Sequence, residues 1–287
     1  MSNVIGRIDL HIHTTVSDGT DTPEELIKKV GEAGISVFSV TDHDAVKAAK
    51  IIAPLLCDGD PRFIPGVEFS CRDEEGKYHI LGYGYDPDDP SVENVVGYGH
   101  SLRMKKVTAR LDFIKTEFGF DFPEEEITRL LLLDNPGKPH IANLMVKYGY
   151  VDTKERAINE YIDRLHFKSE YVRPEEAISG ILAGGGVPVL AHPFYGSGDE
   201  TIVGDDMEKR LVRLMKFGLC GIEAFYSGFS SKLRREALAL AKKYDLFVTA
   251  GSDYHGTNKL VILGDTGLDD AKKLPAGMVK FLGRFGI

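Results

Sequence analysis

The first 44 residues carry the pattern of a β-α-β unit, which restricts the chain to folds built on parallel strands. An apolar strand pattern ends at Asp9-Leu10-His11-Ile12-His13, and Ile35–Val40 has the composition and length of a second strand. Between them, Thr22-Pro23-Glu24-Glu25 has the features of a helix start, with an N-cap threonine, a proline in the first turn and a glutamate that completes a capping box. Gly34 ends the predicted helix. We therefore predict an α/β fold whose chemistry lies at the carboxyl ends of the strands.

Two histidines, His11 and His13, stand two positions apart near the end of the first predicted strand. Residues i and i+2 of a strand point to the same face, so both imidazoles can reach one ion. Taken alone, such a pair more often marks an exposed polar edge than a metal site. The end of the second strand, Thr41-Asp42-His43-Asp44, adds further candidate ligands at an equivalent place.

The same pattern of a short strand with polar residues near its ends recurs along the chain. The further strands are predicted at Arg62–Glu68, Tyr78–Tyr83, Gly186–Ala191, Gly221–Phe225 and Leu246–Ala250. Candidate ligands at or beside the strand ends are six of the nine histidines and three carboxylates: His11, His13, His43, His79, His192, His255, Asp18, Glu68 and Asp253. Imidazole and carboxylate together suit zinc, manganese or iron. Nine ligands are too many for one ion, so we predict two or three ions that share a bridging carboxylate, an arrangement suited to phosphoester hydrolysis.

Composition limits the class of protein and its partners. The net charge of −9 argues against a basic surface for nucleic acid, although bound cations can invert the local charge in a site. The three cysteines (Cys57, Cys71 and Cys220) show no CxxC spacing and indicate packed thiols in a reducing compartment. No signal-peptide or membrane-spanning pattern is evident. We therefore expect a cytoplasmic protein without membrane partners.

The stretch from about Pro90 to Arg173 interrupts the alternation of strands and helices. It contains helical patterns and no convincing strand. The helices are predicted at Ser101–Glu117, Pro123–Leu133, His140–Tyr148 and Thr153–Leu165. We interpret residues 90–173 as a helical insertion over one face of the fold. The alternative is that these are ordinary barrel helices.

In their order along the whole chain, the motifs resemble those of the PHP (polymerase and histidinol phosphatase) family. They are Asp9-Leu10-His11-Ile12-His13 with Ser17-Asp18-Gly19, Thr41-Asp42-His43-Asp44, Pro65-Gly66-Val67-Glu68, Ala191-His192-Pro193 and Ser252-Asp253-Tyr254-His255. Within the family, the chain looks most like the phosphoesterases that act on nucleoside 3′,5′-bisphosphates and on the 5′ ends of short RNA. Those proteins share a helical insertion before the His-Pro motif.

This resemblance implies a distorted seven-stranded β/α barrel, of the TIM-like kind, with a trinuclear metal site. The barrel would comprise residues 1–89 and 174–287, and residues 90–173 would form the helical insertion covering the active site. Carried over by motif, His11, His13, Glu68 and Asp253 would hold a first metal. Glu68, His79 and His192 would hold a second, and Asp18, His43 and His255 a third. Of these, Glu68, Asp253 and His255 are the residues expected to be directly catalytic.

The expected chemistry is phosphomonoester hydrolysis with two to three divalent ions (Mn, Zn or Fe). A hydroxide held between two ions would attack phosphorus, because metal binding lowers the pKa of water toward neutrality. The expected substrate is a small phosphorylated molecule, most specifically a nucleoside 3′,5′-bisphosphate, with short RNA as a further substrate and long DNA excluded.

Substrate contacts are expected from the helical insertion. Arg103 could clamp a phosphate, and Lys138 and His140 could add polar contacts. The related phosphoesterases tend to carry arginine in both segments, so Lys138 is a departure; the alternative for each residue is a solvated helix position. We interpret His166 and Glu223 as structural, with Glu223 also placed where it could support a ligand.

Three other functions compete with this interpretation. A histidinol-phosphate phosphatase would share the metals and differ only in its pocket. A non-catalytic metal-binding regulatory module would be expected to have lost ligands, whereas every position here is filled. A processive exonuclease on long nucleic acid is disfavoured by the acidic charge and by the lack of a basic, aromatic-lined track.

Overall fold

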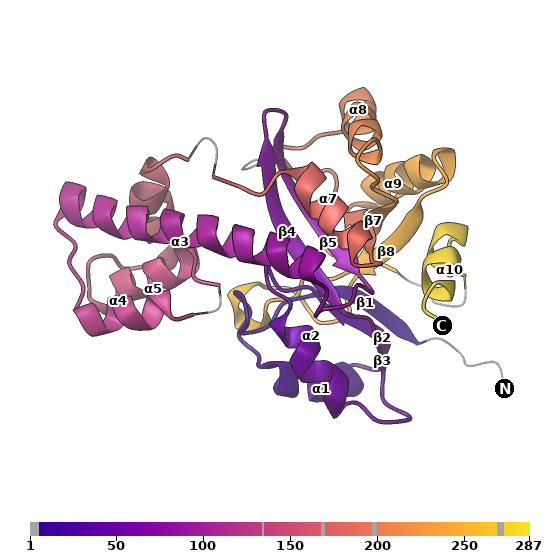
Figure 1. Ribbon diagram of the computed structural model, residues 1–287, viewed down its shortest axis with the longest axis horizontal. Helices are drawn as coiled ribbons and strands as arrows, with labels where there is room; N and C mark the ends of the chain where they lie inside the picture. The colour runs from indigo at the N-terminus through magenta and orange to yellow at the C-terminus, as the bar shows by residue number, and fades with distance from the viewer. Residues whose placement is uncertain (1–5, 134, 168–169, 197–199, 269–272) are drawn as a thin grey trace.

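A computed structural model describes residues 6–133, 135–167, 170–196, 200–268 and 273–287. Val4 and Ile5 of the first predicted strand lie outside the described residues. The described strands run in the order expected from the sequence and are seen in Figure 1. They are β1 (Arg7–Ile12), β2 (Ile35–Val40), β3 (Arg62–Phe63), β4 (Gly66–Asp73), β5 (Gly76–Tyr83), β6 (Val187–Leu190), β7 (Gly221–Tyr226) and β8 (Phe247–Gly251).

These strands form two sheets. One has the order β1-β2-β3 and is parallel, and the other has the order β4-β5-β6-β7-β8. Isolated parallel bridges join the sheets at two places, between Ile12 and Tyr254 and between His43 and Glu68. The Tyr83 hydroxyl also donates a hydrogen bond across the sheets, to the carbonyl of Leu10 at 2.9 Å. Both bridges lie beside predicted metal ligands, so the sheets meet at the candidate site.

The described strands differ from the single seven-stranded barrel expected above. The segment predicted as one strand, Arg62–Glu68, divides into β3 and β4, which belong to different sheets. Pro65 lies between them, and its missing N–H group cannot continue a strand ladder. In addition, β4 and β5 form an antiparallel pair, and β5 is antiparallel to β6. The fold is therefore mixed α/β, and its described strands do not close into one continuous barrel.

Helices cover the outer faces of the sheets. The predicted capping box of α1 is present, because the Thr22 side chain accepts from the Glu25 N–H and the Glu25 carboxylate accepts from the Thr22 N–H. Gly34 follows this helix with a left-handed φ of 66°. The helices and turns outside residues 90–173 are α1 (Pro23–Glu32), α2 (Lys47–Ile52), η1 (Ala53–Leu55), α7 (Pro174–Ala183), α8 (Gly204–Met215), α9 (Ser231–Lys243), η4 (Gly256–Asn258) and α10 (Ala276–Gly283).

The main core lies between the larger sheet and the helices α7 to α10. Phe69 of β4, Phe281 of α10 and Phe194 are fully buried in one apolar cluster. A smaller cluster packs α1 and α2 against the first sheet, around Leu26 and Phe38. Burial on both sides explains why a central strand such as β6 is a continuous apolar run.

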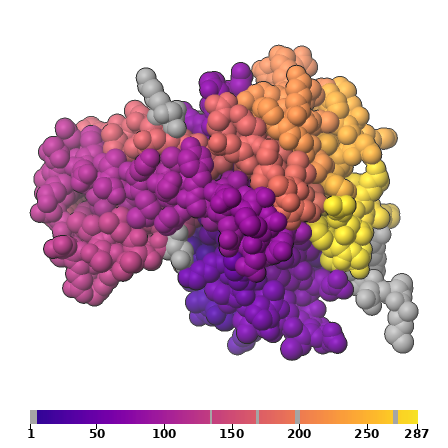
Figure 2. All heavy atoms as spheres, viewed as in Figure 1, coloured from indigo at the N-terminus to yellow at the C-terminus, as the bar shows by residue number. Residues whose placement is uncertain are grey.

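The described residues between 90 and 167 form a helical lobe that projects from the sheets (Figures 1 and 2). Its long first helix begins at Pro90, well before the predicted start at Ser101, and packs against α7 at one end. The predicted helix at Thr153–Leu165 is instead a series of short turns. The elements are α3 (Pro90–Phe118), α4 (Glu124–Leu131), α5 (Lys138–Lys147), α6 (Lys154–Arg156), the π-helical η2 (Ala157–Tyr161) and η3 (Ile162–Arg164).

The helical lobe has an apolar cluster of its own, in which Val107 of α3 packs with Ile141 and Met145 of α5. Among the described residues, no helix combines the length and the apolar character needed to cross a bilayer.

We expect Ile141→Ala to destabilise the protein by about 2–5 kcal/mol, because Ile141 is fully buried and its loss leaves a cavity. Leu132→Ala is the matched control, since Leu132 is 78% exposed in the same lobe and its loss should change stability by less than about 0.5 kcal/mol. Urea unfolding followed by circular dichroism measures both, because the chain has no tryptophan. Equal stability of the two variants would contradict the presence of a packed apolar core around Ile141 in the lobe.

Candidate metal centre

The structure brings all nine predicted ligand residues into one cluster. Each lies on a strand or on the segment that follows it, as the alternation of strands and polar ends predicts. They are His11 (β1), His13 and Asp18 (after β1), His43 (after β2), Glu68 (β4), His79 (β5), His192 (after β6), and Asp253 and His255 (after β8).

Glu68 occupies the centre of this cluster. It is 1% exposed, and five histidines approach its carboxylate. Its Oε2 lies 3.3 Å from His11 Nε2, 3.2 Å from His13 Nε2 and 3.1 Å from His43 Nδ1. Its Oε1 lies 2.8 Å from His79 Nδ1 and 3.3 Å from His192 Nε2. A carboxylate with ligands on both oxygens has the form required to bridge two ions.

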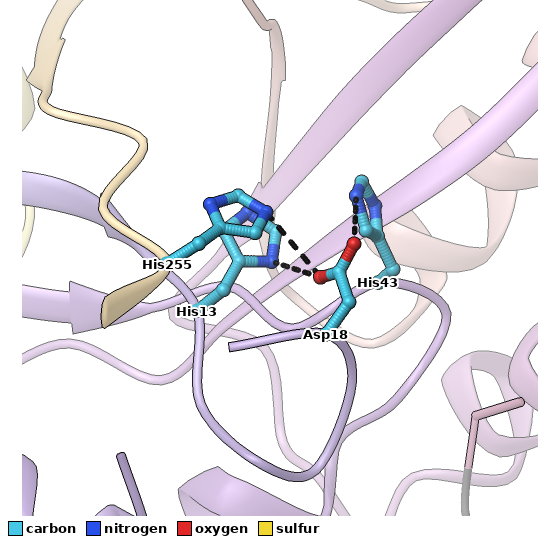
Figure 3. Close-up of side chains that lie close together, drawn as sticks. All are labelled: His13, Asp18, His43 and His255. Atoms are coloured by element: carbon cyan, nitrogen blue, oxygen red, sulfur yellow. Dashed lines mark ion pairs between the residues drawn. The ribbon is translucent and has the colours of Figure 1, made fainter. Parts of the chain in front are cut away.

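Asp18 makes a second centre at the edge of the cluster (Figure 3). Its Oδ1 faces His255 Nε2 at 3.3 Å and His13 Nδ1 at 3.7 Å, and its Oδ2 faces His43 Nε2 at 3.9 Å. The Asp18 side chain is 27% exposed, whereas His13 is fully buried. The Asp18 group therefore lies on the solvent side of the cluster.

Asp253 makes a third set of contacts. Its Oδ1 lies 3.5 Å from His11 Nε2 and 3.4 Å from both His13 Nε2 and His255 Nδ1. Its Oδ2 accepts hydrogen bonds from the Tyr226 hydroxyl at 2.9 Å and from Lys259 Nζ at 2.7 Å. Neither Tyr226 nor Lys259 is expected from the sequence, because neither stands in a motif or at a ligand spacing.

The donor set fits divalent ions. Two ligands on one tetrahedral zinc-like ion are about 3.4 Å apart, close to the separations around Glu68 and Asp253. Several buried polar atoms lack a hydrogen-bond partner: His11 Nε2, His13 Nε2, His43 Nδ1 and Glu68 Oε2. Unpartnered buried groups of this kind are costly, and a bound cation would satisfy them. Three compatible groups emerge: His13, Asp18, His43 and His255; His11, His13 and Asp253; and His43, Glu68 and His79.

The electrostatics of the cluster favour cations. Burial raises the pKa of Asp253, but the positive charges of His11, His13 and Lys259 outweigh it and hold the pKa well below its usual range. Burial lowers the pKa of His13, but Asp253 and Glu68 outweigh it and raise the pKa to about 9. Protons on His11 and His13, whose pKa values are both raised, therefore balance part of the buried negative charge, whereas burial lowers the pKa values of His43, His79 and His255. An incoming ion must displace those protons.

Two buried aspartates hold the segments that carry the ligands. Asp9 accepts hydrogen bonds from Ser252 N at 2.9 Å, Ser252 Oγ at 2.6 Å and Gly264 N at 2.8 Å. Asp42 accepts from Thr14 N at 2.7 Å and from Ser17 Oγ at 2.6 Å. Each carboxylate thus supplies hydrogen-bond acceptors that the backbone N–H groups of these irregular segments would otherwise lack.

The backbone itself is unusual at the ligands. Of the non-glycine residues with left-handed φ in the described chain, His192 (25°) and Asp253 (60°) are candidate ligands, and Asp44 (50°) follows one. Such conformations cost free energy in residues with a Cβ atom and concentrate at functional sites.

Glu223 supports two of the ligands. It is fully buried on β7, its Oε1 lies 3.0 Å from His11 Nδ1, and its Oε2 accepts from the His192 backbone N–H at 2.7 Å. A Cβ atom on the neighbouring Gly251 would come within 2.2 Å of His11 Cβ and 2.4 Å of Glu223 Oε1. Glu223 therefore holds His11 so that its Nε2 is directed toward Glu68 and Asp253. This is the ligand-supporting role that the position of Glu223 in the sequence left open.

The three predicted substrate residues lie on the helical lobe and are engaged by protein groups. Arg103 of α3 forms an ion pair with Asp44, and Lys138 Nζ lies 2.5 Å from Asp163 Oδ1. His140 Nδ1 accepts from the Gly137 N–H at 3.1 Å. Arg103 and Lys138 would have to exchange these partners to clamp a phosphate.

We expect Glu223→Ala to weaken metal binding roughly 10- to 100-fold, because His11 and the His192 backbone lose their shared acceptor. Glu223→Gln keeps one acceptor and should fall between this variant and the wild type. Metal content at buffered free manganese measures the effect, with the exposed Glu124→Ala as control. Wild-type metal content in Glu223→Ala would contradict this role.

Metal uptake at pH 7 should release protons, because the pKa of His13 is raised to about 9 in the metal-free cluster. The apparent affinity should therefore rise with pH through this range. Calorimetric titration of metal in buffers of different ionisation enthalpy counts the protons. An affinity independent of pH between 6 and 8, or no buffer dependence, would show that His13 is neutral or not a ligand.

Comparison with known proteins shows the family. The PHP domain model matches residues 9–171, more than half of the chain. A 5′-3′ exoribonuclease of Haemophilus influenzae is 27% identical, covering 87% of this chain and 90% of that protein. A phosphoribosyl 1,2-cyclic phosphate 1,2-diphosphodiesterase of Eggerthella lenta is 29% identical, covering 86% and 94%. A 3′,5′-nucleoside bisphosphate phosphatase of Chromobacterium violaceum is 26% identical, covering 88% of each chain.

Solved structures agree with this result. A protein of Bifidobacterium adolescentis assigned as a metal-dependent phosphoesterase superposes with a TM-score of 0.76 at 25% identity, covering 90% of this chain and 91% of that one. An amidohydrolase structure from Chromobacterium violaceum has a TM-score of 0.79 at 23% identity, covering 97% and 96%, and supports the fold. The family model covers most of the candidate metal-ligand motifs of this chain, and the chain shares its fold with the solved structures over nearly its whole length. This chain therefore belongs to the PHP domain family.

Proposed function

We propose that this protein hydrolyses the 3′-phosphate of a nucleoside 3′,5′-bisphosphate. The protein is a phosphoesterase by its family and by its relatives, whose names cover a nucleoside bisphosphate phosphatase, an exoribonuclease and a cyclic phosphodiesterase. The observation that carries the chemistry is the buried cluster around Glu68, with its unpartnered imidazole nitrogens. The choice of substrate rests on the resemblance to the bisphosphate phosphatase and on cationic side chains beside the cluster.

In this proposal the nine clustered residues hold two or three divalent ions. Glu68 would be shared between two of them, Asp253 would hold an ion together with His11 and His13, and Asp18 would hold an ion together with His43 and His255. Bound ions would supply an activated water at neutral pH and neutralise the negative charge on the phosphoryl oxygens. Glu223 keeps His11 oriented, and Lys259 and Tyr226 keep the free oxygen of Asp253 occupied, so that its other oxygen stays directed at the cluster.

The rest of the chain has a separate task. We propose that residues 90–173 recognise the substrate, as an insertion in a catalytic domain formed by residues 1–89 and 174–287. The two sheets, joined by the Ile12–Tyr254 and His43–Glu68 bridges, then represent a distorted and interrupted β/α barrel. In this proposal Arg103 and Lys138 exchange their partners Asp44 and Asp163 for phosphate oxygens of the substrate.

A phosphoester panel with the manganese-, zinc- or iron-reconstituted protein tests the substrate. It comprises adenosine 3′,5′-bisphosphate, 5′-phosphorylated short RNA, phosphoribosyl 1,2-cyclic phosphate and histidinol phosphate, with the released product measured. We expect the bisphosphate to have the highest kcat/KM. A preference for histidinol phosphate or for the cyclic phosphate would reassign the substrate. Inactivity throughout would favour a non-catalytic metal-binding module.

We expect Glu68→Ala and Asp253→Ala each to reduce turnover to below roughly one per cent of wild type, because both remove charge that holds the cations. Bound metal should fall in parallel. Asp58→Ala, at an exposed acidic position, is the control. Full activity in either site variant would exclude the assignment of these two carboxylates.

A further inference from the structure

A cavity of about 520 Å³ lies between the β4–β5 hairpin and α8. Its walls come from β5 and the turn before it, from the segment that leads into α8, and from α8 itself. They include Glu75, Tyr78, Glu200, Ile202, Val203 and Arg210. A cavity of this size is typical of sites for small molecules.

The cavity lies on the face of β5 opposite to the metal centre. Tyr78 and His79 are consecutive residues of β5, so their side chains project from opposite faces of the strand. His79 Nδ1 lies 2.8 Å from Glu68 Oε1 in the metal cluster, whereas Tyr78 lines the cavity. A ligand in the cavity would therefore occupy a site separate from the metal centre.

Arg210 of α8 brings a buried positive charge to the cavity wall. It is 9% exposed, and its Nε and Nη1 have no hydrogen-bond partner. Its Nη2 donates to the carbonyl of Lys77, and its Cζ lies 4.0 Å from the centre of the Tyr78 ring. A buried guanidinium with two unpartnered nitrogens is costly, and an anionic group in the cavity would satisfy it.

The other two cations in the cavity wall already have carboxylate partners. Arg213 forms an ion pair with Asp73, and Lys209 Nζ lies 3.0 Å from Asp206 Oδ1. In the part of the chain that the structure describes, no carboxylate oxygen lies within ion-pair distance of Arg210. Arg210 is therefore the cation that a ligand can pair with.

Acidic and apolar side chains form the remaining wall. Glu75 and Glu200 are exposed, and the charge of Glu200 acts on Arg210 from beyond ion-pair distance. These two carboxylates would repel a dianion and attract a cationic group of a ligand. Ile202 is half-buried, and Val203 is 45% exposed, so the cavity also has an apolar side.

We propose that this cavity binds a small zwitterion, an amino acid with an apolar side chain. The carboxylate of the ligand would pair with Arg210, its ammonium group would face Glu75 and Glu200, and its side chain would pack on Ile202 and Val203. Each group of the ligand then meets a wall of matching chemistry. This inference is independent of the proposed function, because no residue of the metal cluster takes part.

A purely structural role of Arg210 makes a different prediction. By donating to the Lys77 carbonyl and packing on Tyr78, Arg210 could serve only to fasten α8 to β5. Its loss would then lower stability, and the cavity would bind no amino acid. Glu75 separates the two roles, because its side chain is exposed and its replacement by glutamine leaves the contacts of Arg210 intact.

The test titrates the zinc-loaded protein with L-leucine and with L-phenylalanine, followed by saturation-transfer NMR of the ligand. We expect at least one of them to bind with a Kd below about 1 mM. Arg210→Met should weaken this binding at least tenfold, and Glu75→Gln at least threefold. Lys216→Met, at an exposed position directly after α8, is the matched control and should behave as wild type.

Analogues that lack one charge supply the second readout, and they need no variant. For leucine they are 4-methylpentanoate and 3-methylbutylamine, and for phenylalanine 3-phenylpropanoate and 2-phenylethylamine. Each should bind at least tenfold more weakly than its amino acid. The zwitterion site would be overturned if neither amino acid binds or if an analogue binds as tightly as its amino acid. Unchanged binding in both Arg210→Met and Glu75→Gln would also overturn it, because the amino acid would then bind elsewhere, such as at the metal centre.

Discussion

The structure depends on one buried carboxylate, Glu68, and on the charges around it. A single ionised carboxylate without partners would be too costly to bury at 1% exposure. Five imidazoles compensate it. Two come from β1 and the segment after it, and one each comes from the end of β2, from β5 and from the end of β6. The two sheets are therefore held together at their meeting point by a polar centre. Its net charge depends on whether protons or cations occupy the histidines.

This arrangement explains why so much of the surrounding structure is polar and buried. Asp9 and Asp42 are not among the candidate ligands, yet both are fully buried and accept hydrogen bonds from the segments after β8 and β1. Their hydrogen bonds allow the ligand-bearing segments to be irregular and still satisfied. The site requires irregular backbone, because a regular strand directs only every second side chain to the same face.

How far the sequence predicts this site depends on the type of residue. Ligands such as His11, His13 and Asp253 stand in short motifs whose spacing has a direct geometric meaning, so their convergence could be predicted. Lys259 and Tyr226 contact Asp253 through segments that no local pattern relates to it. The division of Arg62–Glu68 into two strands was also missed, since Pro65 is compatible with either a strand edge or a break. Pairing between distant segments, such as β5 with β6 in antiparallel orientation, leaves no trace in strand composition.

Net charge, like strand pairing, does not predict the local site, and the local charges explain how an acidic protein can accept phosphates. The net charge of −9 describes the whole chain, whereas two cations lie directly beside the candidate metal centre, Arg103 on Asp44 and Lys259 on Asp253. A protein of net negative charge repels a long polyanion as it approaches, whereas cations bound inside a small site can reverse the local charge and accept a phosphate ester.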